Sequence, residues 1–235
     1  MSGLPGPLLG VSTSSVAAVG LLLPGGQVLR AATAAPRAHT EELVPLIAEV
    51  LGQAGLGPGD LAGIGVGIGP APYTGLRIGL VTARTMGFAL GVPVWGVSDL
   101  DVLAADAVRR LGLVPGLVLG VAADAKRREV YWAAYRVDPA AVGGVARVAG
   151  PAVDTPAAAA AGLAAAGVAT TVGGGAALYA EVLNPAADGP VAVDPVLVAE
   201  LAWQTAQRGA PVAPEPIYLR RPDVAAPAPR KRATV

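Results

Sequence analysis

One order of predicted elements occurs nearly twice along this chain, and this repetition restricts the folds that it can adopt. In the first half, apolar runs separated by turn residues predict three antiparallel strands. The first of these strands is Leu8–Val11, followed by the polar turn Ser12–Ser15, and Pro24–Gly26 marks a later turn. An amphipathic helix over His39–Gly55, a buried strand (GIGVGIGP), a helix over Thr74–Gly91 and a strand (VPVWGVS) follow.

The second half begins after about residue 113 and follows a similar order. The strand LVLGVAA, the polar turn DAKRR and the alternating strand EVYWAAYRV come first, and RVAGPAV is a candidate third strand. An Ala-rich helix starting near Thr155–Pro156, the strand VATTVGGG, the helices AALYAEVL and DPVLVAELAWQTAQRG, and the extended piece PEPIYLRRP follow. Repeated β-β-β-α-β-α units predict an α/β fold with a duplicated ribonuclease-H-like core. Actin-like phosphotransferases have this architecture and bind nucleotide between their two halves.

Composition excludes several classes of chemistry. The 235 residues include no cysteine and one histidine, His39, so the chain can build neither a thiolate nucleophile nor a metal site with cysteine or two histidine ligands. Acidic and basic residues number 17 each, which argues against nucleic-acid binding by this chain on its own. The stretch before Arg30 is uncharged, but prolines, serines and glycines interrupt it and it lacks a basic start. We therefore expect no signal peptide, no membrane span and a cytoplasmic protein.

Two polar turns are the candidate nucleotide-binding sites of such a fold. Actin-like ATPases place a carboxylate after the first strand of each half, because a hard divalent cation prefers oxygen ligands. Here the first turn offers Ser12 and Thr13 without a carboxylate, whereas the second has Asp124, followed by Lys126–Arg128. The turns are either ordinary hairpins or the remnant of a nucleotide site built from Ser12, Thr13 and Asp124. In both cases we expect metal-assisted hydrolysis to be compromised.

The segment GPAPYTGLRIG, Gly69–Gly79, predicts a tight loop that leads into a close-packing helix, and we do not expect a catalytic site there. Small residues recur every four positions along one side of this helix, at Gly75, Gly79, Ala83 and Gly87. Each interior glycine costs up to ~1 kcal/mol relative to alanine, so the close approach of another backbone should compensate. That backbone belongs either to the protein's own sheet or to a partner protein. We favour the partner, with Arg77 flanking the contact.

Several blocks of the sequence together resemble the TsaB (YeaZ) family. GVGIGPAPYTGLRIGLVTARTMGFALGVPVWGVSDL resembles the family pattern GRGPGSFTGLRIG…A.GLA…PV.GVS.L, and LLGVSTSS resembles the opening LAIDTS. PRAHTEELVPLI resembles P..HSE.L.P.I, DAKRREVYWAAY resembles DARMGEVYWA.Y, and PEPIYLR resembles the closing P.YLR. The blocks occur in the family's order over nearly the whole chain, so their joint match is specific.

The resemblance implies an actin-like ATPase (ASKHA) fold of two ribonuclease-H-like lobes, with mixed sheets flanked by helices. We assign residues 1–105 to an N-terminal, partner-binding lobe and 106–222 to a smaller second lobe whose C-terminal segment can return to the first. Residues 223–235 form a Pro/Ala tail that we expect to be disordered. The resemblance further implies a non-catalytic subunit in the synthesis of N6-threonylcarbamoyladenosine, a tRNA modification beside the anticodon.

The resemblance also implies partners. A TsaD-type subunit would hold the metal and transfer the threonylcarbamoyl group, a TsaE-type ATPase would complete the complex, and tRNA would bind only through the complex. Pairing with TsaD, or with a second copy when the partner is absent, would use the two helices of the first lobe. We expect no cofactor or metal held strongly by this chain alone, and place ATP or ADP, where bound, at the TsaD interface. The candidate interface residues are His39, Glu42, Gly75, Arg77, Gly79, Ala83 and Gly87.

The chain departs from the family pattern in four places. Ser12 replaces the usual Asp, Ile68 replaces an Arg, Ala71–Tyr73 replaces Gly-Ser-Phe, and Arg128 replaces a Gly. The change at Ser12 further weakens the case for nucleotide hydrolysis by this chain alone. An actin-like small-molecule kinase or ATPase is the alternative function, and Asp124 is the residue that favours it. A metallopeptidase would need a histidine pair that the chain lacks.

Overall fold

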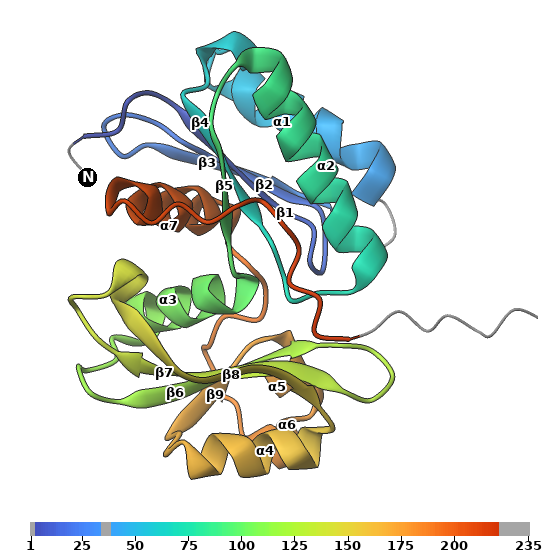
Figure 1. The fold of residues 1–235 in the computed structure, drawn as a ribbon, viewed down its shortest axis with the longest axis vertical. Coiled ribbons are helices and arrows are strands. Elements are labelled where there is room, and N and C mark those ends of the chain that lie inside the picture. The colour runs from blue at the N-terminus through green and yellow to red at the C-terminus, as the bar shows by residue number, and fades with distance from the viewer. Residues whose placement is uncertain (1–2, 34–38, 221–235) are drawn as a thin grey trace, which may run out of the picture.

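The chain folds into two sheets with helices on both faces of each sheet (Figure 1). The structure is a computed structural model and describes residues 3–33 and 39–220. The strands are β1 (Leu8–Ser12), β2 (Ala18–Leu22), β3 (Val28–Ala32), β4 (Gly63–Gly67), β5 (Val94–Val97), β6 (Val118–Asp124), β7 (Val130–Val137), β8 (Val145–Asp154) and β9 (Thr170–Val172). The helices are α1 (His39–Gln53), α2 (Tyr73–Leu90), α3 (Asp99–Leu111), α4 (Pro156–Ala165), α5 (Gly174–Leu178), α6 (Ala180–Leu183) and α7 (Pro195–Gln207), with short 3₁₀ turns η1 (Pro58–Asp60) and η2 (Val142–Gly144).

Helices and sheets alternate in five layers (Figure 1). Helices α1 and α2 cover the outer face of the first sheet, and α4 with α5 and α6 covers the outer face of the second. Helices α7 and α3 lie between the two sheets and contact each other. Separate clusters of buried apolar side chains fill the spaces between these layers.

The first sheet has the strand order β3-β2-β1-β4-β5. Strands β1, β2 and β3 pair antiparallel, whereas β4 and β5 continue the sheet parallel to β1. Strands β1, β2 and β4 are buried along their whole length because helices cover both faces, which explains their continuous apolar sequences. Helix α7 lies so close that a Cβ at Gly20 would be 2.6 Å from the Val196 nitrogen and one at Gly65 2.8 Å from the Ala199 Cα. Glycine at these positions therefore lets a helix backbone rest directly on the sheet.

The second sheet repeats this topology without a fifth strand. Its order is β8-β7-β6-β9, with β6, β7 and β8 antiparallel and β9 parallel to β6. The duplicated ribonuclease-H-like core that the element order predicts is therefore confirmed. Two such lobes with helices between them form the actin-like ATPase (ASKHA) fold.

Helices α3 and α7, which lie between the two sheets, do not follow the lobe boundary predicted from the sequence. Helix α3, which sequence reasoning missed, spans the predicted boundary at residue 105 and packs against strands of the second sheet. Helix α7 comes late in the chain, yet it packs against β1, β2 and β4 of the first sheet. Each sheet is thus covered on its inner face by a helix from the other half of the sequence. The predicted helix AALYAEVL is two short helices, α5 and α6, because Tyr179 has non-helical dihedral angles (φ −118°, ψ 46°).

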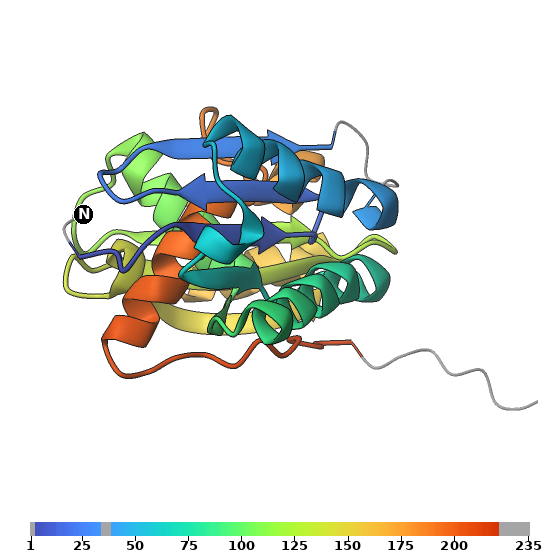
Figure 2. The same ribbon diagram turned by 90° about the horizontal axis from the view of Figure 1, so that it is seen from above.

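After α7 the chain runs back past the first sheet to the start of α2 (Figure 2). The Gly96 N–H donates to the Val212 carbonyl at 2.8 Å, and the Ile217 N–H donates to the Ile68 carbonyl, also at 2.8 Å. The described part of the predicted extended piece PEPIYLRRP, residues 214–220, therefore follows the β4–α2 loop without forming a regular strand. The tail 223–235, predicted to be disordered, lies outside the described residues. Within the described part of the chain, no helix is long and apolar enough to cross a membrane.

Candidate functional site

A cavity of about 780 Å³ opens between the two lobes. It is lined by the turn after β1 (Thr13–Val16), the loop after β4 (Pro70–Pro72), the start of α2, Asp124 at the end of β6, and Lys126 in the turn that follows. Ligands of open α/β sheets bind at the carboxyl ends of the strands, and this cavity has that position. Its volume also lies within the range of roughly 300–1,000 Å³ that is typical of small-molecule sites. The cavity is therefore the candidate nucleotide cleft.

The hydroxyls of Ser12 and Thr13 are already engaged within the protein. Ser12 is buried, and its Oγ donates to Asp99 Oδ1 at 3.2 Å. Thr13 Oγ1 donates to the Gly75 carbonyl at 2.8 Å and accepts from the Gly79 N–H at 3.1 Å. Thr13 lines the cleft, whereas Ser12 is buried and is not among the residues that line it. The hydroxyls of both residues join the end of β1 to neighbouring elements. A phosphate would have to compete with these internal hydrogen bonds.

Asp124 faces the same cavity from the second lobe, and its carboxylate is also occupied. Its Oδ1 accepts from the Lys126 backbone N–H at 2.7 Å, and its Oδ2 pairs with Lys126 Nζ at 2.6 Å. Among the described residues, no group of three or more His, Asp or Glu side chains is placed to hold a metal ion. As the chain stands, Asp124 contributes a single carboxylate that an ammonium group neutralises.

Sequence reasoning missed the buried carboxylate of Asp99, the first residue of α3, directly behind the cleft. Asp99 Oδ2 accepts from the Gly69 N–H at 2.5 Å, while Oδ1 accepts from Ser12. Burial raises the pKa of Asp99 from 3.8 to about 6, and the hydrogen bonds from Gly69, Ser12 and Ser14 only partly offset that effect. Asp99 thus ties together β1, the β4–α2 loop and α3, at the junction of the two lobes.

The small-residue stripe of α2 faces the protein's own first sheet. Gly79, Ala83 and Gly87 are all buried. A Cβ at Gly79 would lie 2.5 Å from Thr13 Oγ1, and one at Gly87 would overlap the side chain of Val94 on β5. Gly79, Ala83 and Gly87 are therefore corrected from interface residues to internal packing residues. The closely approaching backbone is the chain's own sheet, one of the two options that the sequence left open.

Apolar side chains are instead exposed on the outer sides of α1 and α2, which lie next to each other over the first sheet (Figure 2). Phe88 is 92% exposed, and Val81 on α2 and Val44 on α1 are each 63% exposed. Val81 and Phe88 are two helical turns apart and share one side of α2. We call Val44, Val81 and Phe88 the α1–α2 face. A search for apolar residues seven apart along α2, opposite the stripe, would have found Val81 and Phe88 in the sequence.

The other predicted interface residues occupy different surroundings. Glu42 is exposed on α1, and Gly75 is half-buried beneath Thr13. Arg77 is exposed, with its guanidinium carbon 3.8 Å from the centroid of the Tyr73 ring and its Nε donating to the Tyr218 hydroxyl at 2.9 Å. His39 begins α1, but its side chain lies outside the described part of the structure.

Comparisons with known proteins agree with this fold. The family model described as TsaD, tRNA N6-adenosine threonylcarbamoyltransferase, matches residues 31–188. An uncharacterized protein of Mycobacterium tuberculosis is 40% identical over 191 residues, which is 80% of this chain and 77% of that protein. The Escherichia coli tRNA threonylcarbamoyladenosine biosynthesis protein TsaB is 29% identical over 145 residues, 56% of this chain and 55% of that protein.

Solved structures extend the similarity over the whole fold. YeaZ from Pseudomonas aeruginosa superimposes with a TM-score of 0.75 at 30% sequence identity, covering 91% of this chain and 100% of that one. The strand order, the blocks of sequence and these relatives lead to one assignment. This chain belongs to the TsaB (YeaZ) family of tRNA threonylcarbamoyladenosine biosynthesis proteins.

Proposed function

We propose that this chain is a non-catalytic subunit of the machinery that makes N6-threonylcarbamoyladenosine in tRNA, and that it binds and activates a TsaD-type transferase. The observation that carries the proposal is the α1–α2 face. Phe88, the chain's one phenylalanine, is 92% exposed on that face, with Val81 on the same side of its helix. An aromatic side chain flanked by aliphatic ones is typical of the centre of a protein interface.

The energetics of the α1–α2 face support pairing. Burial of a Phe or Val side chain is worth ~1.5–3 kcal/mol, so Phe88, Val81 and Val44 together can supply several kcal/mol to an association. Part of this gain offsets the freedom that two proteins lose when they bind. The same face can pair two copies of the chain when a TsaD-type partner is absent, because a two-fold interface brings identical patches together.

The state of the cleft supports a division of labour between the subunits. Asp124 is neutralised by Lys126, and the hydroxyls of Ser12 and Thr13 are engaged internally. We therefore assign the metal and the transfer reaction to the TsaD-type subunit. In this proposal ATP or ADP binds where the two subunits meet, and a TsaE-type ATPase completes the complex. The assembled complex then modifies tRNA in the cytoplasm.

A substitution at Phe88 tests the proposal, with Val114→Asp as a matched control. Val114 is 63% exposed, like Val81, but it lies in the loop after α3, away from α1 and α2. We expect Phe88→Asp to weaken binding to a TsaD-type protein by tenfold or more, about 1.4 kcal/mol, because a carboxylate would be desolvated in the interface. Light scattering gives the mass of each variant alone and mixed with the partner, and modified nucleoside in tRNA is measured in parallel.

Two results would contradict the proposal. Undiminished pairing by Phe88→Asp would show that α2 is not the contact surface. Full tRNA modification by the TsaD-type protein without this chain would remove its assigned role. Val114→Asp should pair and support modification like the parent chain, since its charge lies outside the proposed contact.

The cavity between the lobes favours one alternative, an actin-like small-molecule kinase or ATPase. It has the volume and the position of a nucleotide site, with Asp124 on its wall. Metal-dependent nucleotide turnover by the isolated chain, lost in Asp124→Asn, would establish that activity. Absence of turnover under the same conditions would favour the scaffold role.

A further inference from the structure

A second, smaller cavity lies beside the cleft and has a different chemical character. It measures about 270 Å³ and forms where the start of α2, the β6–β7 turn and the C-terminal segment meet. Its polar lining consists of three tyrosines and three cations, Tyr73, Tyr131, Tyr218, Lys126, Arg127 and Arg220. None of the described residues that line it is acidic. Neither the cleft nor the α1–α2 face explains this combination.

The aromatic rings at the mouth of the small cavity form an exposed platform. Tyr73 and Tyr218 stack with their ring centroids 4.9 Å apart, and they are 43% and 41% exposed. Arg77 lies against Tyr73 and donates to the Tyr218 hydroxyl, which holds the two segments together. The C-terminal segment therefore brings Tyr218 to the start of α2, 145 residues away in the sequence.

Positive charge is concentrated around this platform although the whole chain is neutral. Five cations lie at or next to the small cavity, Arg77, Lys126, Arg127, Arg128 and Arg220. Lys126 pairs with Asp124, and Arg220 pairs with Glu129. These five cations outnumber the two carboxylates, Asp124 and Glu129, that pair within the patch. Net neutrality therefore does not exclude a local site for an anionic polymer.

The β6–β7 turn holds its three cations at a conformational cost. Lys126, Arg127 and Arg128 all have left-handed backbone angles, with φ of 60°, 54° and 61°. The turn is closed by hydrogen bonds between Ala125 and Glu129 and from Glu129 to Lys126, each 3.0 Å long. Non-glycine residues are disfavoured in this region, and such conformations cluster at functional sites. Arg128 stands where the family pattern has glycine, which points to a use for its side chain.

We propose that the small cavity and the β6–β7 turn bind a single-stranded loop of RNA. One unstacked base would lie against the Tyr73–Tyr218 platform, and backbone phosphates would meet Lys126, Arg127 and Arg128. Single-stranded RNA is recognised by this combination, in which bases stack on aromatic rings and arginine planes beside a cationic track for the phosphates. The inference rests on the proposed function, because it makes this chain one of the tRNA-contacting surfaces of the complex.

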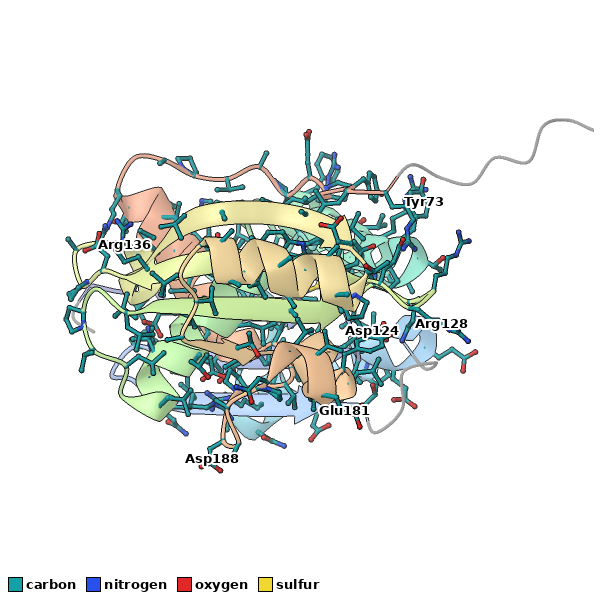
Figure 3. The ribbon with its side chains drawn as sticks, turned by 90° about the horizontal axis from the view of Figure 1, so that it is seen from below. Tyr73, Asp124, Arg128, Arg136, Glu181 and Asp188 are labelled. Atoms are coloured by element: carbon teal, nitrogen blue, oxygen red, sulfur yellow. The ribbon has the colours of Figure 1, made fainter. Side chains whose placement is uncertain are left out.

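Binding of a labelled RNA stem–loop, followed by fluorescence anisotropy, tests the inference on the full chain and on its complex with a TsaD-type protein. Arg128→Ala removes a phosphate contact, and Arg136→Ala is its matched control. Both arginines are exposed, but they lie at opposite ends of the second sheet (Figure 3). We expect Arg128→Ala to raise the dissociation constant for the stem–loop about fivefold, and to reduce the salt dependence of binding by about one phosphate contact. Arg136→Ala should change the dissociation constant by less than about twofold.

Tyr218 provides a second, independent pair of variants. Tyr218→Ala removes the ring and should weaken RNA binding about fivefold or more, as loss of one base–aromatic stack does. Tyr218→Phe keeps the ring and loses only the hydroxyl that contacts Arg77, so its affinity should stay within about twofold of the parent chain. A fully paired RNA duplex should bind more weakly than the stem–loop, because its bases are not free to stack.

Several outcomes would overturn the inference. Equal losses in Arg128→Ala and Arg136→Ala would indicate attraction to net charge alone. Tighter binding of AMP or of a Glu-rich peptide than of the stem–loop would assign the patch to a nucleotide or an acidic protein segment. Light scattering separates this inference from the proposed function, since the Arg128 and Tyr218 variants should still pair with the TsaD-type protein. Loss of pairing in these variants would count against both.

Discussion

Replacement of Asp99 by asparagine should stabilise the folded chain above pH 6 and change it little near pH 4. The carboxylate is 2% exposed and burial raises its pKa from 3.8 to about 6. Between these two values the folded chain holds a proton that the unfolded chain has released. The free energy of unfolding therefore falls as the pH rises through this window, and the loss is complete above about pH 6.

The size of the effect follows from the two pKa values. The difference between 3.8 and about 6 corresponds to about 3 kcal/mol of lost stability at pH 7 and above. Asparagine keeps the shape of the side chain and stays neutral. Its carbonyl oxygen can accept from the Gly69 N–H, and its amide can donate to Ser12 Oγ, so both partners of Asp99 remain satisfied. We expect Asp99→Asn to gain ~1–3 kcal/mol at pH 8 and under ~1 kcal/mol at pH 4.

Urea unfolding of the parent chain and of Asp99→Asn, measured at pH values from 4 to 8, gives the difference in unfolding free energy directly. The difference isolates Asp99, because all other titrating groups are common to both proteins. Ser14→Ala is a useful companion, since it removes a hydroxyl near Asp99 without changing charge. A difference that stays constant from pH 4 to pH 8, or an asparagine variant that is less stable throughout, would refute this account of Asp99.

Two further substitutions follow from backbone geometry. Gly79→Val should lower the free energy of unfolding by ~1–3 kcal/mol, because its Cβ would lie 2.5 Å from Thr13 Oγ1. Thr85 is exposed on the same helix, so the control Thr85→Val should change the free energy of unfolding by less than ~0.5 kcal/mol. Equal stability of these two variants in thermal unfolding would contradict the inward orientation of the stripe. Arg128→Gly should raise stability by about 1 kcal/mol, since glycine accepts a φ of 61° without strain, while it weakens binding of the RNA stem–loop. A less stable Arg128→Gly would show that the side chain, and not a ligand, compensates for the turn.

The topology was predictable because the sheets are buried on both faces. Strands such as β1 and β2 give uninterrupted apolar runs, and the turns between them are marked by Ser, Pro and Gly. The repeated order of these runs then specified two similar lobes. The exchange of α3 and α7 between the sheets was not predictable in this way, because both helices are amphipathic or apolar and the sequence does not say which sheet each one covers.

Helix α3 and Asp99 were missed for different reasons. Helix α3 does carry local signals, with Asp99 and Asp101 in its first turn and Arg109 and Arg110 in its last. It was overlooked because it follows β5 with only Ser98 between them. The burial of Asp99 has no local signal at all. It depends on Gly69 and Ser12, which lie 30 and 87 residues away in the sequence.

The small-residue stripe of α2 predicts close packing correctly but does not identify the neighbouring element. The stripe of Gly79, Ala83 and Gly87 indicates that a backbone approaches α2 closely, but it does not identify that backbone. The opposite side of the helix decides the matter. A helix whose small residues fit its own sheet would normally present polar residues to water, yet α2 presents Val81 and Phe88. The exposed apolar side, and not the stripe, is therefore the feature that calls for a partner, and the prediction of an interface on α2 rests on different residues from those that first suggested it.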